Sequence, residues 1–462
     1  CINLPKIMKK NISHIFNIFL VFHLVIWTLI PFFSNTNLPL DVIEALAWGS
    51  NLEWGFEKHP PLSAFFLETF FQIFGNQDWA FYLLSQLFIV ISFIVVFKLA
   101  KEFLKNETYA LISILLLEGI YFFNYTTPEF NVNVCQIPFW GLTIYYAWQS
   151  FQNDKIHNWV LFGLFAGLGV LSKYLFIYLL IGIKLFFIFY LIKNKKFNIK
   201  FFIPIVVFLL VLSPHLIWLV ENDYKTISYG LKRTSLEDST LINHLIYPLK
   251  FVFKQIGVLI PFFVLLSLIL KKYKFKINQS DKKSIFLIFV TIVPIVLMVI
   301  TSLIFAANIR TMWMTPFYLS FGLFFIYHFK SKINLYFLKK FIITFLFIFI
   351  LSPVVYLYIS LSNDNKRTDY PGKEISQLIQ SRWNKNFTNK ISIVVGDEWL
   401  AGNLSYHLES RPRWFKNLNP KVKNLKIEGG VIYVGNKDIL KSVCPGEYGS
   451  IKLQGICMIG TR

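Results

Sequence analysis

The sequence contains none of the short motifs that carry nucleotide or metal chemistry in soluble enzymes. It has no glycine-rich phosphate-binding loop, no nucleophile elbow, no CxxC pair and no residues at metal-ligand spacing. Acidic residues are scarce as well, since 25 Asp and Glu stand against 46 Lys and Arg. Reactions on soluble nucleotides are therefore not expected. No cofactor is predicted, and the need for a divalent metal is left open.

Long apolar runs, in contrast, dominate the chain. Of its 462 residues, 55% are hydrophobic, and the mean hydropathy is +0.54. A run of about 20 apolar residues crosses a ~30 Å hydrocarbon core as a helix, so the predicted fold is a polytopic α-helical membrane protein with about eleven transmembrane helices. The predicted spans lie near residues 15–34, 79–99, 109–125, 132–149, 158–172, 174–192, 201–219, 251–270, 284–305, 312–328 and 340–361.

The formal net charge of +21 would suit a nucleic-acid partner, but the distribution of the charge argues against one. The lysines cluster in the loops that follow every second span, as the positive-inside rule predicts for cytoplasmic loops. We therefore expect no nucleic acid, and a protein of the cytoplasmic membrane with a cytoplasmic N-terminus and an extracytoplasmic C-terminus. The chain begins with Cys1, and Met8 opens a normal membrane-protein start, so residues 1–7 are expected to precede the native protein.

Two extracytoplasmic segments are long. Residues 35–78, the first loop, are predicted to form two short amphipathic helices along the membrane surface, the second starting at Pro60-Pro61. The tail, residues 363–462, is predicted to be a small α/β domain that follows a transmembrane domain of residues 1–362.

The tail contains both kinds of secondary structure. ISIVVG (391–396) and GGVIYVG (429–435) are typical of short buried strands, and residues 398–410 between them favour a helix. Cys444 and Cys457 both lie in the tail. Two cysteines in an extracytoplasmic domain predict a disulfide where the compartment is oxidising.

The first loop holds the best candidates for chemistry. In LDVIEALAWGSN, the residues Asp41, Glu44, Trp48 and Asn51 recur on one face of a short helix. A carboxylate just outside the first span could take a proton from an acceptor hydroxyl. The same D-x-x-E spacing is also a capping box, in which Asp41 caps the helix and Glu44 reaches back to it. Both interpretations stay open, and both can hold at once.

Four basic side chains on the same predicted side could hold an anion. Lys58 and His59 precede the two prolines, Lys173 lies between two spans with almost no loop, and Arg310 has a similar place in AANIRTMW. Together they would suit an anionic phospholipid ligand. The alternative is that such side chains only extend from helix ends toward water.

Three polar residues in the remaining loops are further candidates. Glu129 is the only charged residue in YFFNYTTPEFNVN, and Asn131 beside it could bind a sugar hydroxyl or cap the next span. His215, in SPHLIWLVEND, ends the seventh span. A lone histidine at a helix end is more often structural than catalytic.

Taken together, these stretches resemble a known family. An acid just after the first span, a Gly-aromatic turn and KHPPL are similar to the GT-C class of membrane glycosyltransferases. GLFAGLGVLSKY (162–174) and SPHLIWLVEND (213–223) resemble further motifs of its bacterial members. The similar branch contains the protein O-mannosyltransferases, the lipid A aminoarabinose transferases and the rhizobial core galacturonosyltransferases. The resemblance covers roughly residues 15–330.

The resemblance implies an inverting glycosyltransferase that moves a sugar from a polyprenyl-phosphate donor to a lipid, glycan or protein acceptor at the outer face of the membrane. The implied partners are thus this donor, its acceptor and membrane lipids. The implied catalytic residues are Asp41 and Glu44. The implied ligands of the donor phosphate are Lys58, His59, Lys173 and Arg310. The implied contacts with the substrates are Trp48, Asn51, Glu129, Asn131 and His215.

Two other functions remain as alternatives. A transporter would place charges or broken helices near the middle of the bilayer and repeat its two halves. Glu118 does lie inside a predicted span, but paired halves are not visible in the sequence. An envelope polysaccharide polymerase or ligase would carry its large loop late in the chain, whereas here the longest loop between spans follows the first one.

Overall fold

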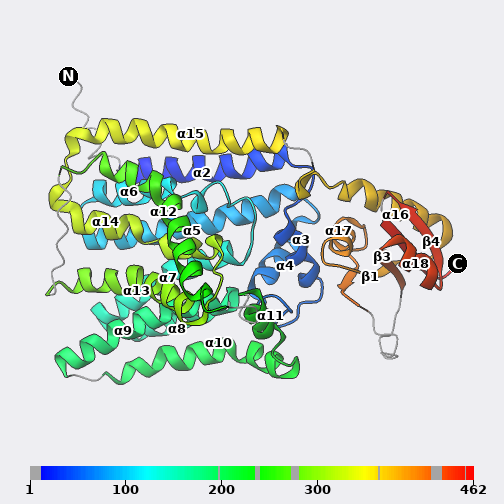
Figure 1. Ribbon diagram of the computed structural model, residues 1–462, viewed down its shortest axis with the longest axis horizontal. Coiled ribbons are helices and arrows are strands. Elements are labelled where there is room, and N and C mark those ends of the chain that lie inside the picture. Colours follow the sequence, from blue (N-terminus) through cyan, green and yellow to red (C-terminus); the bar gives the residue numbers. More distant parts are fainter. Residues whose placement is uncertain are drawn as a thin grey trace.

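The computed structural model describes residues 12–195, 198–234, 240–271, 280–362, 365–417, 429–452 and 454–462. These residues form two parts (Figure 1): a bundle of long helices lying side by side, and a smaller part of helices and strands at one end of it. Residues 1–7, which are expected to precede the native protein, lie outside the described residues, as do residues 363–364 at the predicted domain boundary.

Within the described residues, seven helices are long and apolar enough to cross a membrane, which makes the chain a multi-pass membrane protein. These helices are α2 (Ile12–Ser34), α5 (Asp78–Leu104), α9 (Ile177–Asn194), α10 (Phe202–Glu221), α12 (Asn243–Ser267), α13 (Lys282–Phe305) and α15 (Leu338–Ser362).

The four other predicted spans are also helical, but they are shorter, less apolar or interrupted. Two are α7 (Val132–Asn153) and α8 (Ile156–Ser172), and two combine an α-helix with 3-10 turns: α6 (Glu107–Leu115) with η1 (Leu116–Gly119) and η2 (Tyr121–Phe123), and η5 (Thr311–Tyr318) with α14 (Phe321–Phe329). At the first interruption a Cβ on Gly119 would lie 2.7 Å from Phe262 Cα, so glycine permits the close approach of α12. Eleven crossings stay a prediction.

Glu118, the acid inside a predicted span, has a structural explanation. Its Oε1 lies 2.7 Å from His23 Nδ1, and its Oε2 accepts a hydrogen bond of 3.1 Å from Asn124. All three side chains are buried in the bundle. A buried carboxylate needs such partners, because an unpaired one would be costly to desolvate. Glu118 therefore does not by itself favour a transporter.

The segments that the lysine pattern assigns to one side of the membrane do lie together. At the lysine-rich end, Lys283 Nζ at the start of α13 donates to the Glu102 carbonyl at the end of α5, 2.8 Å away. At the other end, the first loop, the loop before α7 and the end of α10 converge where the bundle meets the C-terminal part (Figure 1). Which end faces the cytoplasm stays a prediction.

The first loop forms the two expected helices, α3 (Leu40–Gly49) and α4 (Leu62–Phe74), and Pro61 is the N-cap of the second. Most of α3 is buried, since it packs against α4 and against α17 of the C-terminal part. The position of both helices along the membrane surface stays a prediction. A further short helix, α11 (Lys225–Arg233), lies in the loop after α10 and was not predicted.

The C-terminal part is a five-stranded sheet with helices. Its strand order is β2-β1-β3-β5-β4. Strands β2, β1 and β3 are parallel to one another, and β5 pairs antiparallel with both β3 and β4. The two strands expected from the sequence are β1 (Ile391–Val395) and β3 (Gly430–Gly435), and the expected helix is α17 (Leu400–His407). The other elements are α16 (Gly372–Asn386), β2 (Arg413–Phe415), α18 (Lys437–Val443), β4 (Glu447–Ile451) and β5 (Gln454–Ile459).

The predicted disulfide is confirmed, because Cys444 and Cys457 are bonded with their Cα atoms 5.6 Å apart. The bond closes a loop with a sequence separation of 13. Loops of this length constrain the unfolded chain by about 3 kcal/mol. Replacing both cysteines with alanine should lower the unfolding free energy of the C-terminal part by about that amount, measured by denaturant titration. A reductant should then destabilise the wild type and leave the double variant unchanged.

Candidate active site

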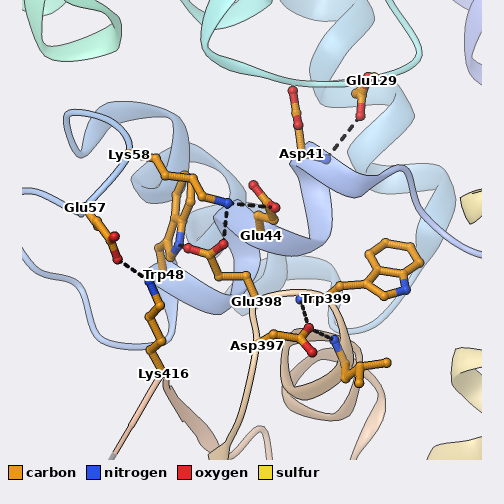
Figure 2. A network of polar contacts seen from close by, with 11 residues as sticks. Asp41, Glu44, Trp48, Glu57, Lys58, Glu129, Asp397, Glu398, Trp399 and Lys416 are labelled. Atoms are coloured by element: carbon orange, nitrogen blue, oxygen red, sulfur yellow. Dashed lines mark hydrogen bonds and ion pairs between the residues drawn. The ribbon is translucent and has the colours of Figure 1, made fainter. Parts of the chain in front are cut away.

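The candidate site lies where the bundle meets the C-terminal part (Figure 2). Helix α3 presents Asp41, Glu44 and Trp48 there, and the turn before α4 adds Lys58. The C-terminal part contributes Glu398, which the sequence interpretation missed. Residues more than 300 positions apart in the chain thus share one polar network.

Asp41 is not the cap of α3. The N-cap is Pro39, and it makes no side-chain capping bond. Instead, the backbone N–H of Asp41 donates to Glu129 Oε1 at 3.1 Å, so a carboxylate from the loop before α7 caps the helix. The capping-box interpretation is therefore wrong. Among the described residues, no hydrogen bond or ion pair engages the Asp41 carboxylate, which leaves it free to act on a ligand (Figure 2).

Burial raises the pKa of the Asp41 carboxyl above its ordinary value. Four cations oppose this shift and keep the site attractive to an anion: Lys58, Lys173, Arg233 and Arg367. A carboxylate with a raised pKa accepts a proton more readily than an ordinary one, as a general base requires.

Glu129 is the second acid of the site. Burial raises its pKa to about 8, and the neighbouring charge of Asp41 adds to this shift. Two partly buried carboxyls that interact in this way do not both ionise easily, so the pair carries one negative charge more readily than two.

Lys173 is buried, with 7% of its surface exposed, between α8 and the turn η3 (Tyr174–Phe176). Its Nζ donates to Asn133 Oδ1 at 2.5 Å and lies 5.0 Å from the centre of the Trp313 ring. Burial lowers the pKa of Lys173 to about 7, and the charge of Arg310 lowers it further, whereas Asp41 opposes the shift. Lys173 thus interacts electrostatically with both Asp41 and Arg310.

Two of the cations around Asp41 were missed in the sequence. Arg233 ends α11, and its guanidinium lies 5.9 Å from the Tyr229 ring. Arg367 follows α15 and stacks over Trp399 at 5.7 Å. The sequence offered little to identify either arginine. Each is one of several basic residues in a loop on the predicted outer side, and no periodic pattern indicates which way its side chain points.

Lys58 and His59 differ from the expected pair of cations. Burial lowers the pKa of His59 to about 3, so this histidine is neutral when no anion is bound, and its contact with the phosphate stays a prediction. Its ring packs at 6.0 Å from Trp48 and 6.4 Å from Tyr229. Lys58 is charged, but Nζ already contacts Glu44 and Glu398.

Three of the predicted substrate contacts have protein partners in the structure, although Asn51 also lines the cavity described below. The Asn51 side chain donates a hydrogen bond to the Trp414 carbonyl and accepts one from Arg413 Nε, so it links the first loop to the C-terminal part. The Asn131 side chain caps α7, which was the alternative considered for it. His215 is described next.

His215 fastens the first loop to α10. Its Nδ1 lies 2.6 Å from the Trp54 carbonyl and must be the donor, since a carbonyl only accepts. Its Nε2 then accepts from the Tyr174 hydroxyl at 2.6 Å. Both nitrogens are occupied, so His215 is structural rather than a contact with the substrate.

A cavity of about 610 Å³ opens beside this network, between the first loop, α11 and the C-terminal part. The rings of Trp48, Trp218 and Trp414 contribute to its wall, together with Glu398. Asp41 does not line it, so the free carboxylate lies outside this cavity. Among the described residues, no group of three or more His, Cys, Asp or Glu side chains is placed to hold a metal ion.

Comparisons with known proteins agree with this arrangement. The family model described as dolichyl-phosphate-mannose-protein mannosyltransferase matches residues 58–218. The lipid A galacturonosyltransferase RgtD of Rhizobium johnstonii is 23% identical over 276 residues, which are 58% of this chain and 55% of RgtD. The chain thus matches about half the length of that curated relative.

The fold is that of ArnT from Cupriavidus metallidurans. The apo structure of ArnT superposes with a TM-score of 0.62 at 11% identity, over 96% of this chain and 98% of ArnT. ArnT bound to undecaprenyl phosphate gives a TM-score of 0.59 at 13% identity, over 96% and 97%. The resemblance to the GT-C class of membrane glycosyltransferases is therefore confirmed.

Proposed function

We propose that this protein is an inverting glycosyltransferase that takes a sugar from a polyprenyl-phosphate donor and passes it to an acceptor hydroxyl at the outer face of the membrane. The observation that carries the proposal is the free carboxylate of Asp41, buried and surrounded by cations at the end of the helix bundle. The relatives named above act on lipid-linked substrates or bind a polyprenyl phosphate, which supports the same donor class.

The proposed reaction uses the Asp41 carboxylate to accept a proton and the surrounding cations to hold the phosphate. The acceptor oxygen attacks the anomeric carbon from the face opposite the phosphate, and its proton passes to Asp41. The bond between the anomeric carbon and the phosphate oxygen breaks, and the polyprenyl phosphate leaves with the electron pair. The configuration at the anomeric carbon is thereby inverted.

The leaving group needs no proton, because a phosphate is already a stable anion, but it needs cations. Lys173 and Arg310 act on one another electrostatically and are the proposed ligands of the phosphate. Arg233 and Arg367 extend the same positive field around Asp41. Glu44 is held by Lys58 and is a weaker candidate for the base than Asp41.

The acceptor is proposed to bind in the 610 Å³ cavity, where aromatic faces suit a sugar ring, with its reacting hydroxyl extending beyond the cavity to Asp41. The lysine pattern supports a cytoplasmic N-terminus and an extracytoplasmic C-terminal part, and the proposed location is the inner membrane of a bacterium. A lipid acceptor is favoured by the name of RgtD, although a glycan or a protein would satisfy the same chemistry.

The test is transfer of a labelled sugar by the purified protein in lipid nanodiscs. Polyprenyl-phosphate donors should label a lipid, glycan or protein fraction, and the product should carry the inverted anomeric configuration by NMR. Nucleotide sugars should give no product. Transfer from a nucleotide sugar, or no transfer from any lipid-linked donor, would contradict the proposal.

The pH dependence of transfer should be bell-shaped. Lys173 carries its charge below its pKa of about 7 and loses it as the pH rises, so kcat/KM for the donor should fall on the alkaline side. Asp41 must be ionised, and its raised pKa places the acidic limb above the ordinary range of aspartate. The Lys173→Arg variant should lose the alkaline limb. An unchanged alkaline limb in that variant would assign it to another group.

A further inference from the structure

Glu398 lies in the turn that leads into α17, and this helix is docked on the bundle. It lies between β1 and α17, where Asp397 Oδ1 accepts the backbone N–H groups of Trp399 at 2.9 Å and Leu400 at 2.7 Å (Figure 2). Helix α17 packs directly on α3, because a Cβ on Gly402 would meet Ile43 Cγ2 at only 3.1 Å. The position of Glu398 therefore depends on how the C-terminal part is seated.

Glu398 shares one ammonium group with a second carboxylate. Lys58 Nζ donates to Glu44 Oε1 at 3.0 Å and to Glu398 Oε2, while Glu398 Oε1 accepts from Trp48 Nε1 at 3.2 Å. The side chains of Lys58, Glu44 and Glu398 are only 21%, 13% and 12% exposed. Screening by water and salt is weaker here than between fully exposed side chains.

This arrangement compensates the charge of Lys58. Two carboxylates facing one ammonium leave no net positive charge to attract another anion. A phosphate that binds Lys58 therefore competes with both carboxylates for the charge of the ammonium. Glu44 lies on α3 beside Asp41, whereas Glu398 belongs to the C-terminal part, which packs on α3 through α17, so a shift of that part withdraws Glu398 and not Glu44.

We propose that Glu398 is a positioning residue: it holds Lys58 against α3 until the phosphate of the lipid donor replaces Glu398 on the ammonium. This inference rests on the proposed function. It follows that donor binding and the seating of α17 are coupled, and the coupling acts in both directions. The C-terminal part is then a component of the donor site and not a passive addition to it.

The first test compares two Glu→Gln variants of the full-length protein. Glu398→Gln keeps the shape and the acceptor for Trp48 but removes the charge. Glu374→Gln changes an exposed glutamate that pairs with Lys452 at 3.0 Å within the C-terminal part. Binding of undecaprenyl phosphate in nanodiscs should become about three- to tenfold tighter in Glu398→Gln and stay unchanged in Glu374→Gln. Weaker or unchanged binding in Glu398→Gln would overturn the inference.

Kinetics separate this role from a merely structural one. In Glu398→Gln the KM for the donor should fall while kcat stays the same or declines, since the contact of residue 398 with Lys58 is weaker but the reacting groups are intact. A variant that only loosened the fold would lower kcat without lowering KM. A raised KM would mean that Glu398 supports phosphate binding, which contradicts the inference.

A third measurement needs no variant. Hydrogen–deuterium exchange in the peptide that carries residues 397–404 should accelerate when undecaprenyl phosphate is added to the wild type, and slower or unchanged exchange would overturn the coupling. If undecaprenyl phosphate binds neither protein, the proposed function fails together with this inference. If it binds wild type and Glu398→Gln equally, only the role of Glu398 fails.

Discussion

Replacing Asp41 with asparagine is expected to lower the rate of sugar transfer by about 10²- to 10⁴-fold, the range that a lost general base costs. The carboxylate has no hydrogen-bond or ion-pair partner among the described residues, so its removal breaks no contact that holds the fold. The thermal unfolding temperature should therefore stay close to that of the wild type or rise slightly, since a buried charge disappears. Transfer is measured with labelled donor under single-turnover conditions.

The matched control is Asp438→Asn, which changes an exposed aspartate in the first turn of α18. It should transfer sugar at the wild-type rate. If Asp41→Asn also kept that rate, the base would have to be sought at Glu44 or Glu129. If Asp41→Asn lost activity only because it unfolded, the fall in unfolding temperature would reveal this.

Replacing Lys173 with methionine is expected to be the second most damaging change. Methionine has a similar length but no charge, so the leaving phosphate loses a buried cation. Removing one such stabilising group costs about 10²- to 10³-fold in kcat. The pKa of Lys173 is about 7, so its charge is held at a cost to the folded state. The unfolding temperature should therefore not fall at pH 6, where the wild type carries the charge.

Lys98→Met is the control for this experiment. Lys98 lies in α5, near its lysine-rich end, and its Nζ is 4.7 Å from the Tyr145 ring. It should leave transfer unaffected. Equal losses in the two variants would mean that the total charge of the protein matters and not the position of Lys173. Retained transfer in Lys173→Met would assign the phosphate to the arginines instead.

Several features of the protein could be predicted because they depend on neighbouring residues in the chain. Apolar runs identify membrane helices, since each run must satisfy its own backbone hydrogen bonds in lipid. The i, i+3, i+7 spacing placed Asp41, Glu44 and Trp48 on one face of α3, and α3 has these bounds within a residue or two. The two β-branched runs became β1 and β3, and the cysteine pair became the disulfide.

The roles within the site could not be predicted in the same way. Asp41 is free for chemistry because Glu129 caps α3, and Glu129 is 88 positions away. His59 resembled a cation in the sequence, yet burial keeps it neutral. Asn51 and His215 resembled substrate contacts, yet their side chains already form hydrogen bonds with the Trp414 and Trp54 carbonyls.

The physical reason is the range of each interaction. Hydropathy and helical periodicity act along the chain, so the class of protein and the short helices of the first loop are written in local patterns. Charge compensation, burial and hydrogen-bond satisfaction act through space. Glu398 reaches Lys58 across 340 positions, and only the docking of α17 on α3 brings them together. The presence of Asp41 on α3 could be predicted from the local sequence, whereas the surrounding charges that raise or lower its pKa come together only in the folded protein.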